Sequence, residues 1–187
     1  MEKVGVHKRD ILVSRVEKAR DSQSDAQTKF KSAFEQFDSV IKLENTNLKI
    51  AYEKLNNEYE DIEKAADTVS GRTDKVESVA GALFDEWKKE LTLYQNNDLR
   101  KASDAQLRKT KTHYKEMIAS MHQAEKSMAP VLRIFRDNVL FLKHNLNAQA
   151  IGSLQNEFSN LKGEIATLIN NMNDAIESSN AFIKNIK

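Results

Sequence analysis

The chain has 187 residues, which suits one domain or one elongated bundle, and 40% of its residues are hydrophobic and 30% charged. A net charge of +1 excludes a strong overall attraction to nucleic acid, and the lack of cysteine excludes disulfides, thiolate nucleophiles and thiolate metal sites. One proline and five glycines are few chain breakers, which favours long helices over sheet.

Four segments place apolar residues at alternating spacings of three and four, as helices with coiled-coil-like packing do. Strands would need a period of two, which no segment keeps for long. Short connections between long helices make antiparallel neighbours. We therefore predict an all-α protein, an elongated antiparallel up-down-up-down four-helix bundle in one domain. Its helices are expected near 8–42, 47–94, 98–143 and 148–186.

The first two predicted helices have long apolar stripes. The rhythm lapses between them near residue 44, and either Thr46 or Asn47 is expected to cap the second helix by accepting a hydrogen bond from a free N–H. The first stripe runs Val16, Ala19, Gln23, Ala26, Phe30, Ala33, Phe37 and Val40. The second runs Leu48, Tyr52, Leu55, Tyr59, Ile62, Ala66, Val69, Thr73, Val76, Ala80, Leu83 and Trp87.

The third predicted helix follows the polar run QNND, in which Asp98 is the expected cap. Pro130 should kink this helix near Ser127, because proline removes one helical hydrogen bond. Glu125 lies within the stripe, either as a functional buried carboxylate or, more commonly, at the edge of the seam. The stripe runs Tyr114, Ile118, Met121, Glu125, Met128, Leu132, Phe135, Val139 and Leu142.

The segment FLKHNLNAQAIGSL, residues 141–154, contains a predicted corner. Ile151 and Leu154 continue in a different heptad phase from the preceding stripe, so one straight helix would carry two opposed apolar faces. The chain should reverse here, with Asn145 or Asn147 capping the last helix. The candidate corner residues are His144, Asn145 and Asn147. The fourth stripe runs Ile151, Leu154, Phe158, Leu161, Ile165, Leu168, Met172, Ala175, Ser179, Phe182 and Ile186.

Charge is distributed unevenly between the two middle helices. Residues 44–90 contain twelve acidic and seven basic side chains, whereas residues 98–143 contain five acidic and ten basic ones. Net charges of −5 and +5 on hairpin partners favour their pairing, although each exposed pair contributes little.

Catalytic and cofactor motifs are absent from the sequence. Its glycines form neither a P-loop nor a dinucleotide-binding motif, and its four histidines never fall three or four residues apart. The Glu-x-x-His pairs of di-iron bundles are missing as well, because Thr110, Ala119 and Phe141 precede the histidines by three. We expect no enzyme, no cofactor and no metal site.

The middle helices are longer than the outer ones, so the hairpin tip near residues 84–108 is predicted to project beyond the bundle. Between residues 88 and 111 it has seven basic and three acidic residues, beside apolar and aromatic ones. This combination suits a membrane surface or a protein partner, unless residues 1–10 or a second subunit cover it. The candidate contact residues are Phe84, Trp87, Lys88, Lys89, Leu91, Tyr94, Arg100 and Lys101.

Four stretches resemble DUF2959, a family of uncharacterised proteins found mainly in marine and related Gammaproteobacteria. They are MEKVGVHKRDILVSRVEKARDSQ (1–23), KLNNEYEDIEKAADTVSGR (54–72), ALFDEWKKELTLY (82–94) and FLKHNLNAQAIGSLQ (141–155). Members usually resemble lipoproteins with a lipidated cysteine shortly before the MEKVG segment. The resemblance thus implies that Met1 is an internal methionine and that the protein is periplasmic or associated with the outer membrane. It implies no activity and no site residues.

Our leading hypothesis is a non-enzymatic helical-bundle protein of the cell envelope that acts as a spacer, scaffold or interaction module. The alternative is a cytosolic coiled-coil protein that forms homo-oligomers through exposed seams, with polar seam residues such as Gln23 and Thr73 specifying register. The chain as given lacks the apolar core of a signal peptide and a lipid-anchor cysteine, so we expect it to be soluble. No nucleic-acid partner is expected.

Overall fold

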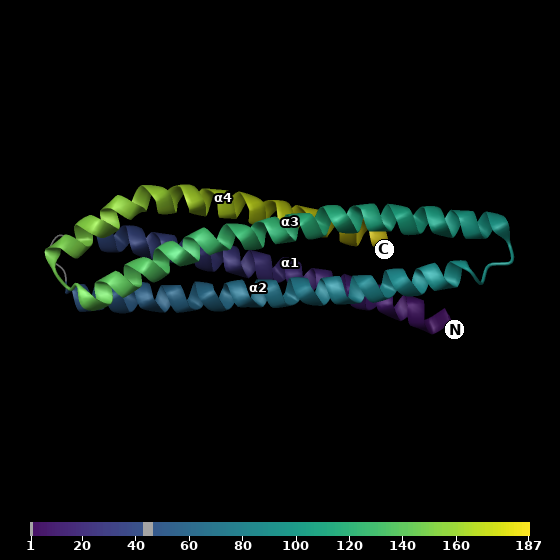
Figure 1. Cartoon of the computed structure of the whole chain (residues 1–187), viewed down its shortest axis with the longest axis horizontal. Coiled ribbons are helices and arrows are strands. Elements are labelled where there is room, and N and C mark those ends of the chain that lie inside the picture. Colours follow the sequence, from purple (N-terminus) through teal and green to yellow (C-terminus); the bar gives the residue numbers. More distant parts are fainter. Residues whose placement is uncertain (1, 43–46) are drawn as a thin grey trace.

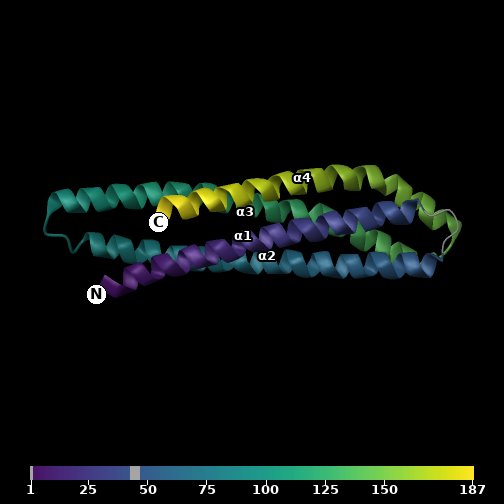
Figure 2. The same ribbon diagram turned by 180° about the vertical axis from the view of Figure 1, so that it is seen from behind.

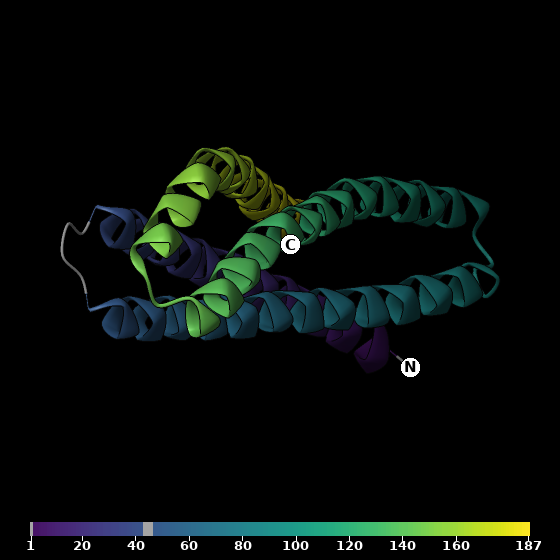
Figure 3. The same ribbon diagram turned by 60° about the vertical axis from the view of Figure 1, so that its left-hand side comes forward.

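The computed structural model describes residues 2–42 and 47–187, with side chains from residue 6 onward. The described chain forms four helices, α1 (Glu2–Ile41), α2 (Leu48–Leu91), α3 (Asn97–His144) and α4 (Ala148–Ile186). They build an elongated rod in which α1 packs against α2 and α4, and α3 packs against the same two neighbours (Figures 1 and 3). The predicted up-down-up-down four-helix bundle is confirmed.

Helix boundaries agree with the predicted ones at the last helix and differ slightly at the others. The first helix begins at Glu2 rather than near residue 8, and α2 ends at Leu91 rather than near residue 94. At 44 and 48 residues, α2 and α3 are longer than α1 and α4, which have 40 and 39. With a rise of about 1.5 Å per residue, α3 is about 72 Å long.

Asparagines begin three of the helices. The side chain of Asn47 accepts from the N–H of Lys49, which confirms one of the two caps expected there, whereas Thr46 lies outside the described residues. Asp98 was the wrong choice for α3, because Asn96 is its cap. Its Oδ1 accepts from the N–H groups of both Asp98 and Leu99. These groups lie two and three residues after Asn96, where a capping side chain reaches them.

Two asparagines cap the two helix ends at the corner after α3. Asn147 caps α4 through the N–H of Gln149, whereas Asn145 ends α3, with its side-chain amide donating to the carbonyl of Phe141. No described non-glycine residue has positive φ, so these asparagines cap helix ends without entering the left-handed region. His144 is the last residue of α3 and is exposed.

One continuous core runs between the four helices. The first predicted stripe is buried at every position, including the polar Gln23. The second and fourth stripes are mostly buried. Their half-buried positions are Leu48, Tyr52, Tyr59, Ala66, Ile151 and Phe158. The stacked rings of Phe34 and Phe158, with centroids 5.3 Å apart, join α1 to α4.

The third stripe is partly displaced from its predicted positions. Tyr114, Ile118, Glu125 and Leu132 lie at the edge of the core, half-buried rather than buried. Because α3 packs against both α2 and α4, its buried face is wider than a single seam and includes positions that the alternation skips. The additional buried residues of α3 are Leu107, Thr110, Met117, Ala124, Ser127, Val131 and Asn138.

Pro130 lies inside α3 and does not divide it. The helix changes direction along its length and crosses towards α2 at the end opposite the hairpin tip (Figures 1 and 3). The hydroxyl of Ser127 donates to the carbonyl of Gln123 and accepts a hydrogen bond from Asn171 of α4. The bond from Asn171 therefore attaches α3 to α4 close to Pro130, whose ring nitrogen cannot donate a helical hydrogen bond.

Candidate contact surface at the hairpin tip

The α2–α3 hairpin extends beyond the ends of the other two helices. Figures 1 and 2 show its connection, residues 92–96, beyond both chain termini, which lie at the same end of the rod. The end of α1, the start of α2 and the corner between α3 and α4 lie at the opposite end (Figure 2). The longer middle helices therefore produce the projecting tip that their lengths predicted.

Three apolar side chains are exposed at this tip. Leu93 is 67% exposed, Tyr94 41% and Leu99 58%. Leu93 and Tyr94 lie in the connection itself, where the backbone leaves α2 before Asn96 starts α3, so their side chains have no neighbouring helix to cover them. These exposed apolar side chains at the end of the hairpin are the candidate contact surface.

Phe84 and Trp87 were predicted to be contact residues of the tip, but both are buried. Trp87 is 9% exposed and Phe84 is 7% exposed. The indole Nε1 of Trp87 donates to Oγ of Ser103 at 2.9 Å, and the guanidinium of Arg9 lies 5.2 Å from the indole centroid. Arg9 of α1 thus covers the base of the tip, in agreement with the sequence-based alternative that residues 1–10 cover it. Trp87 joins α2 to α3 at the same place.

A second contact from α1 reinforces this cover. Nζ of Lys8 lies 2.9 Å from Oε2 of Glu86. Further along the hairpin, the ring of Phe84 packs edge-on against Tyr114, whose ring contacts Phe182 of α4 in the same manner. Burial, and next Glu77, raise the pKa of Tyr114 to about 12. The base of the hairpin is therefore an aromatic extension of the core.

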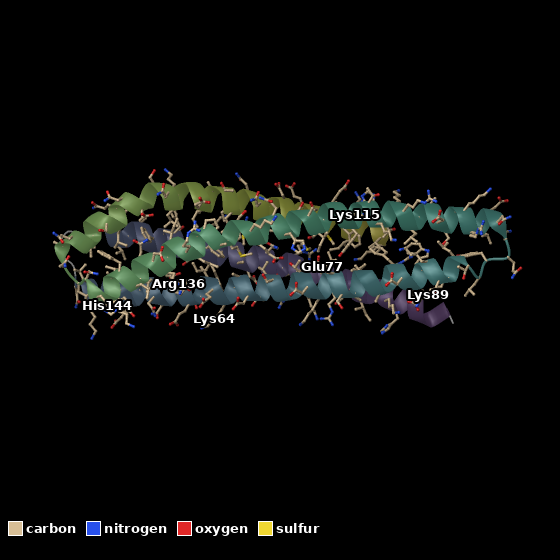
Figure 4. The ribbon with its side chains drawn as sticks, viewed as in Figure 1. Lys64, Glu77, Lys89, Lys115, Arg136 and His144 are labelled. Carbon is tan, nitrogen blue, oxygen red and sulfur yellow. The ribbon has the colours of Figure 1, made fainter. Side chains whose placement is uncertain are left out.

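Positive charge surrounds the exposed apolar groups. Lys88, Lys89, Arg100 and Lys101 are all exposed, whereas Leu91 is half-buried. Burial lowers the pKa of Lys111, and the nearby ammonium of Lys88 lowers it further. The ammonium of Lys88 beside Lys111 is one sign of a local excess of positive charge at this part of the hairpin. Figure 4 shows Lys89 near the projecting end.

The opposite net charges predicted for α2 and α3 do not produce ion pairs of lysine or arginine with a carboxylate between the described residues of these helices. Within the described chain, the contact between a basic and an acidic side chain that joins these helices is the hydrogen bond between Nε2 of His122 and Oε1 of Glu77, 2.8 Å long. Glu77 lies midway along the rod (Figure 4). The opposed net charges therefore act diffusely, over distances at which solvent screens them.

Glu125 belongs to the same small polar group. One of its oxygens accepts from the hydroxyl of Ser70 at 3.0 Å, and the other lies 3.5 Å from Nδ1 of His122. These contacts place Glu125 at the seam edge between α2 and α3. Across the described residues, no group of three or more histidine, cysteine or acidic side chains is arranged to hold a metal ion.

The opposite end of the rod has its own exposed apolar side chains. Ile50 at the start of α2 and Leu140 and Phe141 near the end of α3 are 49%, 49% and 38% exposed. Leu146, in the corner after α3, is 50% exposed. Figure 4 shows His144 at this end. The corner residues therefore lie at the end of the rod that carries these four exposed apolar side chains, far from the tip.

Sequence reasoning did not find the roles of Arg9 and Ser103. Both belong to polar positions of their helices, where the periodicity predicts only solvent exposure. Their contacts with Trp87 depend on the register in which α1 and α3 pack against α2. A pattern along one helix carries no information about that register.

Comparison with known proteins identifies the family of this bundle. The model of a family described as "Protein of unknown function (DUF2959)" matches residues 1–186. The chain belongs to the DUF2959 family. No curated protein and no solved structure matches it. Within the described part of this DUF2959 chain, no helix is both long and apolar enough to span a membrane.

Proposed function

We propose that this DUF2959 protein is a non-enzymatic helical spacer of the bacterial cell envelope, whose α2–α3 tip contacts an anionic membrane surface. The projecting tip carries the proposal, because it combines exposed Leu93, Tyr94 and Leu99 with surrounding lysines and arginines. Tyrosine suits the headgroup region, and each basic residue near an anionic surface contributes roughly 1 kcal/mol.

The position of the N-terminus supports this orientation. The start of α1 lies at the same end of the rod as the tip (Figure 1). The family resemblance implies a lipid anchor shortly before residue 1. One acyl chain alone binds a membrane only marginally, and a basic patch is a common second contribution. An anchor and a basic tip at one end would act together on the same surface.

The length of the rod supports the role of a spacer. The second apolar surface, at Ile50, Leu140, Phe141 and Leu146, would face away from the membrane, about 70 Å from the tip by helix rise. A rigid rod that separates two small contact surfaces suits a protein that holds a partner at a set distance from a membrane.

Vesicle co-sedimentation tests the membrane contact. Because Trp87 is buried, the variants alter exposed groups only, Leu93→Ser with Leu99→Ser in one protein and Arg100→Glu with Lys101→Glu in another. We expect the unmodified chain to bind vesicles rich in phosphatidylglycerol more than neutral ones, and both variants to bind several-fold less.

A variant with the same charge change elsewhere provides the control. Lys31 of α1 and Lys162 of α4 are exposed and lie away from the tip, so Lys31→Glu with Lys162→Glu should retain binding. Equal binding by all four proteins would contradict the proposed tip contact. Tip-dependent recovery of an envelope protein without vesicle binding would assign the tip to a protein partner instead.

Self-association is a second candidate, favoured by the exposed side chains at the end opposite the tip. Leu140, Phe141 and Leu146 would be covered if two rods met there. Light scattering across a range of concentrations tests it, with Leu140→Ser and Phe141→Ser in one variant. A monomer at every concentration would exclude this alternative.

A further inference from the structure

Four basic side chains converge on the outward face of the α1–α2 pair. Arg15 and Lys18 of α1 and Arg72 and Lys75 of α2 line one open pocket of about 230 Å³. No acidic residue lines it. Each pair is spaced three residues apart, which places both members on the same side of their helix. Because α1 and α2 are antiparallel, the two pairs face each other across the groove.

Arg72 is held in place at this pocket. Its Nη1 donates to the backbone carbonyl of Lys18 at 2.8 Å, a bond that links α2 to α1. The guanidinium has other N–H groups that this bond leaves available. Orienting arginine in advance reduces the entropy lost when a planar, multidentate ligand binds.

The four cations have no close acidic partner in the described chain. No carboxylate oxygen of the described residues lies within 4.0 Å of a side-chain nitrogen of Arg15, Lys18, Arg72 or Lys75. Elsewhere on α1, by contrast, Lys8 pairs with Glu86, and Glu17 pairs with Lys187. A recess lined by one sign of charge focuses its field and attracts counter-ions.

A smaller recess continues the groove along the same two helices. It shares Arg72 with the first pocket and is lined also by Lys29 and Lys64, with Asp25 as its one carboxylate. Its other lining residues are small, Ser22, Ala26, Ala65 and Thr68. The groove is deep where the small side chains line it, and the long basic side chains line its two edges. The positive charge therefore extends beyond the four-cation pocket.

We propose that this pocket binds a compact anion that carries two or more phosphate groups. Arginine matches phosphate oxygens in a bidentate manner, and lysine adds a point charge. Four cations exceed what a single carboxylate would balance. The phosphates have two chemical sources, a free oligophosphate or the phosphorylated headgroup of an envelope lipid, and the experiment below separates them.

This pocket is separate from the hairpin tip. Arg72 precedes the end of α2 at Leu91 by nineteen residues, which corresponds to about 28 Å of helix. The pocket therefore lies on the side of the rod, and the tip proposal can fail without affecting it.

Isothermal titration with pyrophosphate tests the pocket, with inorganic phosphate as the weaker comparison. Lys18→Gln with Lys75→Gln removes two charges from exposed side chains and keeps the Lys18 carbonyl that holds Arg72. We expect at least tenfold weaker pyrophosphate binding by this variant. Lys31→Gln with Lys162→Gln removes the same charge elsewhere and should bind within about twofold of the unmodified chain.

Vesicles of cardiolipin, an anionic lipid whose headgroup carries two phosphate groups, form the second arm. If the two pocket substitutions weaken vesicle binding in the absence of any pyrophosphate binding, the phosphate belongs to a lipid headgroup, and the pocket is supported. If pyrophosphate binding falls, a free oligophosphate is supported. Equal effects of the pocket and control variants in both arms, or no binding in either, would overturn the proposal.

Discussion

The indole Nε1 of Trp87 donates a hydrogen bond to Oγ of Ser103 at 2.9 Å, and this bond joins α2 to α3 where the hairpin leaves the four-helix section. Trp87 is the only tryptophan of the chain, so its fluorescence reports on this junction alone. Aromatic packing therefore stabilises the base of the tip, whereas the end of the tip lacks such packing.

Ser103→Ala should destabilise the protein. The indole N–H would remain buried without its partner, which costs roughly 1–2 kcal/mol of unfolding free energy. Urea unfolding followed by tryptophan fluorescence measures this loss. Ser78→Ala, at an exposed serine of α2, is the control and should be nearly neutral. Equal stability of the two variants would show that the bond contributes nothing.

Arg9→Ala should expose the face of the Trp87 ring. The guanidinium lies 5.2 Å from the indole centroid and covers it together with the apolar part of its side chain. We expect a red-shifted native emission and faster quenching by acrylamide. Arg133→Ala, at an exposed arginine of α3, should leave both unchanged. An unaltered spectrum for Arg9→Ala would contradict the cover that α1 provides.

Gln23→Leu should stabilise the bundle. Gln23 is fully buried, and neither polar atom of its side chain has a hydrogen-bond partner among the described residues. Replacing the amide by an apolar group of similar size removes a desolvation cost of roughly 1–2 kcal/mol. Chemical unfolding measures the gain.

Gln23→Ala is the comparison, since it removes the same amide but leaves a cavity. A lower stability of Gln23→Leu than of the unmodified chain would mean that the amide is hydrogen-bonded in solution. If Gln23 specifies register instead, light scattering should detect mixed oligomers in Gln23→Leu.

Asn96→Ala should cost about 1 kcal/mol of unfolding free energy, because two N–H groups at the start of α3 lose their acceptor. Asp98→Asn keeps the shape of the side chain at position 98 but removes its negative charge. It should cost less, about 0.5 kcal/mol, through the lost interaction with the helix dipole. Urea unfolding compares the two directly. A larger loss for Asp98→Asn would restore Asp98 as the more important residue at this helix start.

Tyr114 should make the protein less stable at high pH. Its folded-state pKa is raised from 10.0 to about 12, mainly by burial. Between these values the unfolded chain has lost the phenolic proton while the folded chain retains it, so the free energy of unfolding falls as pH rises. At pH 11–12 the loss should be on the order of 1 kcal/mol, less than the full shift implies, because the phenol is only partly buried.

Tyr114→Phe isolates this contribution, because phenylalanine cannot titrate. The difference in unfolding free energy between the two proteins should change between pH 9 and pH 12, in favour of Tyr114→Phe. An ultraviolet titration of the folded chain should also show two of its four tyrosines ionising late, Tyr114 and Tyr59, because burial raises the pKa of both. A pH-independent difference would contradict the raised pKa.

The sequence by itself determined the number of helices, their order and the position of each reversal. Apolar periodicity is a local property of the chain, and every position of the predicted first stripe, from Val16 to Val40, is buried. The change of phase between Leu142 and Ile151 also located the corner, because a helix cannot bury two opposed faces in one seam.

Only the tertiary structure decided which residues of the tip are covered. Trp87 and Leu93 both occur in an apolar stretch near the hairpin end, but Arg9 and Ser103 bury the first and nothing described covers the second. Likewise, the Arg15, Lys18, Arg72 and Lys75 pocket needs residues more than fifty positions apart to meet. Such meetings depend on helix register and relative rotation, which long-range packing sets and local periodicity does not encode.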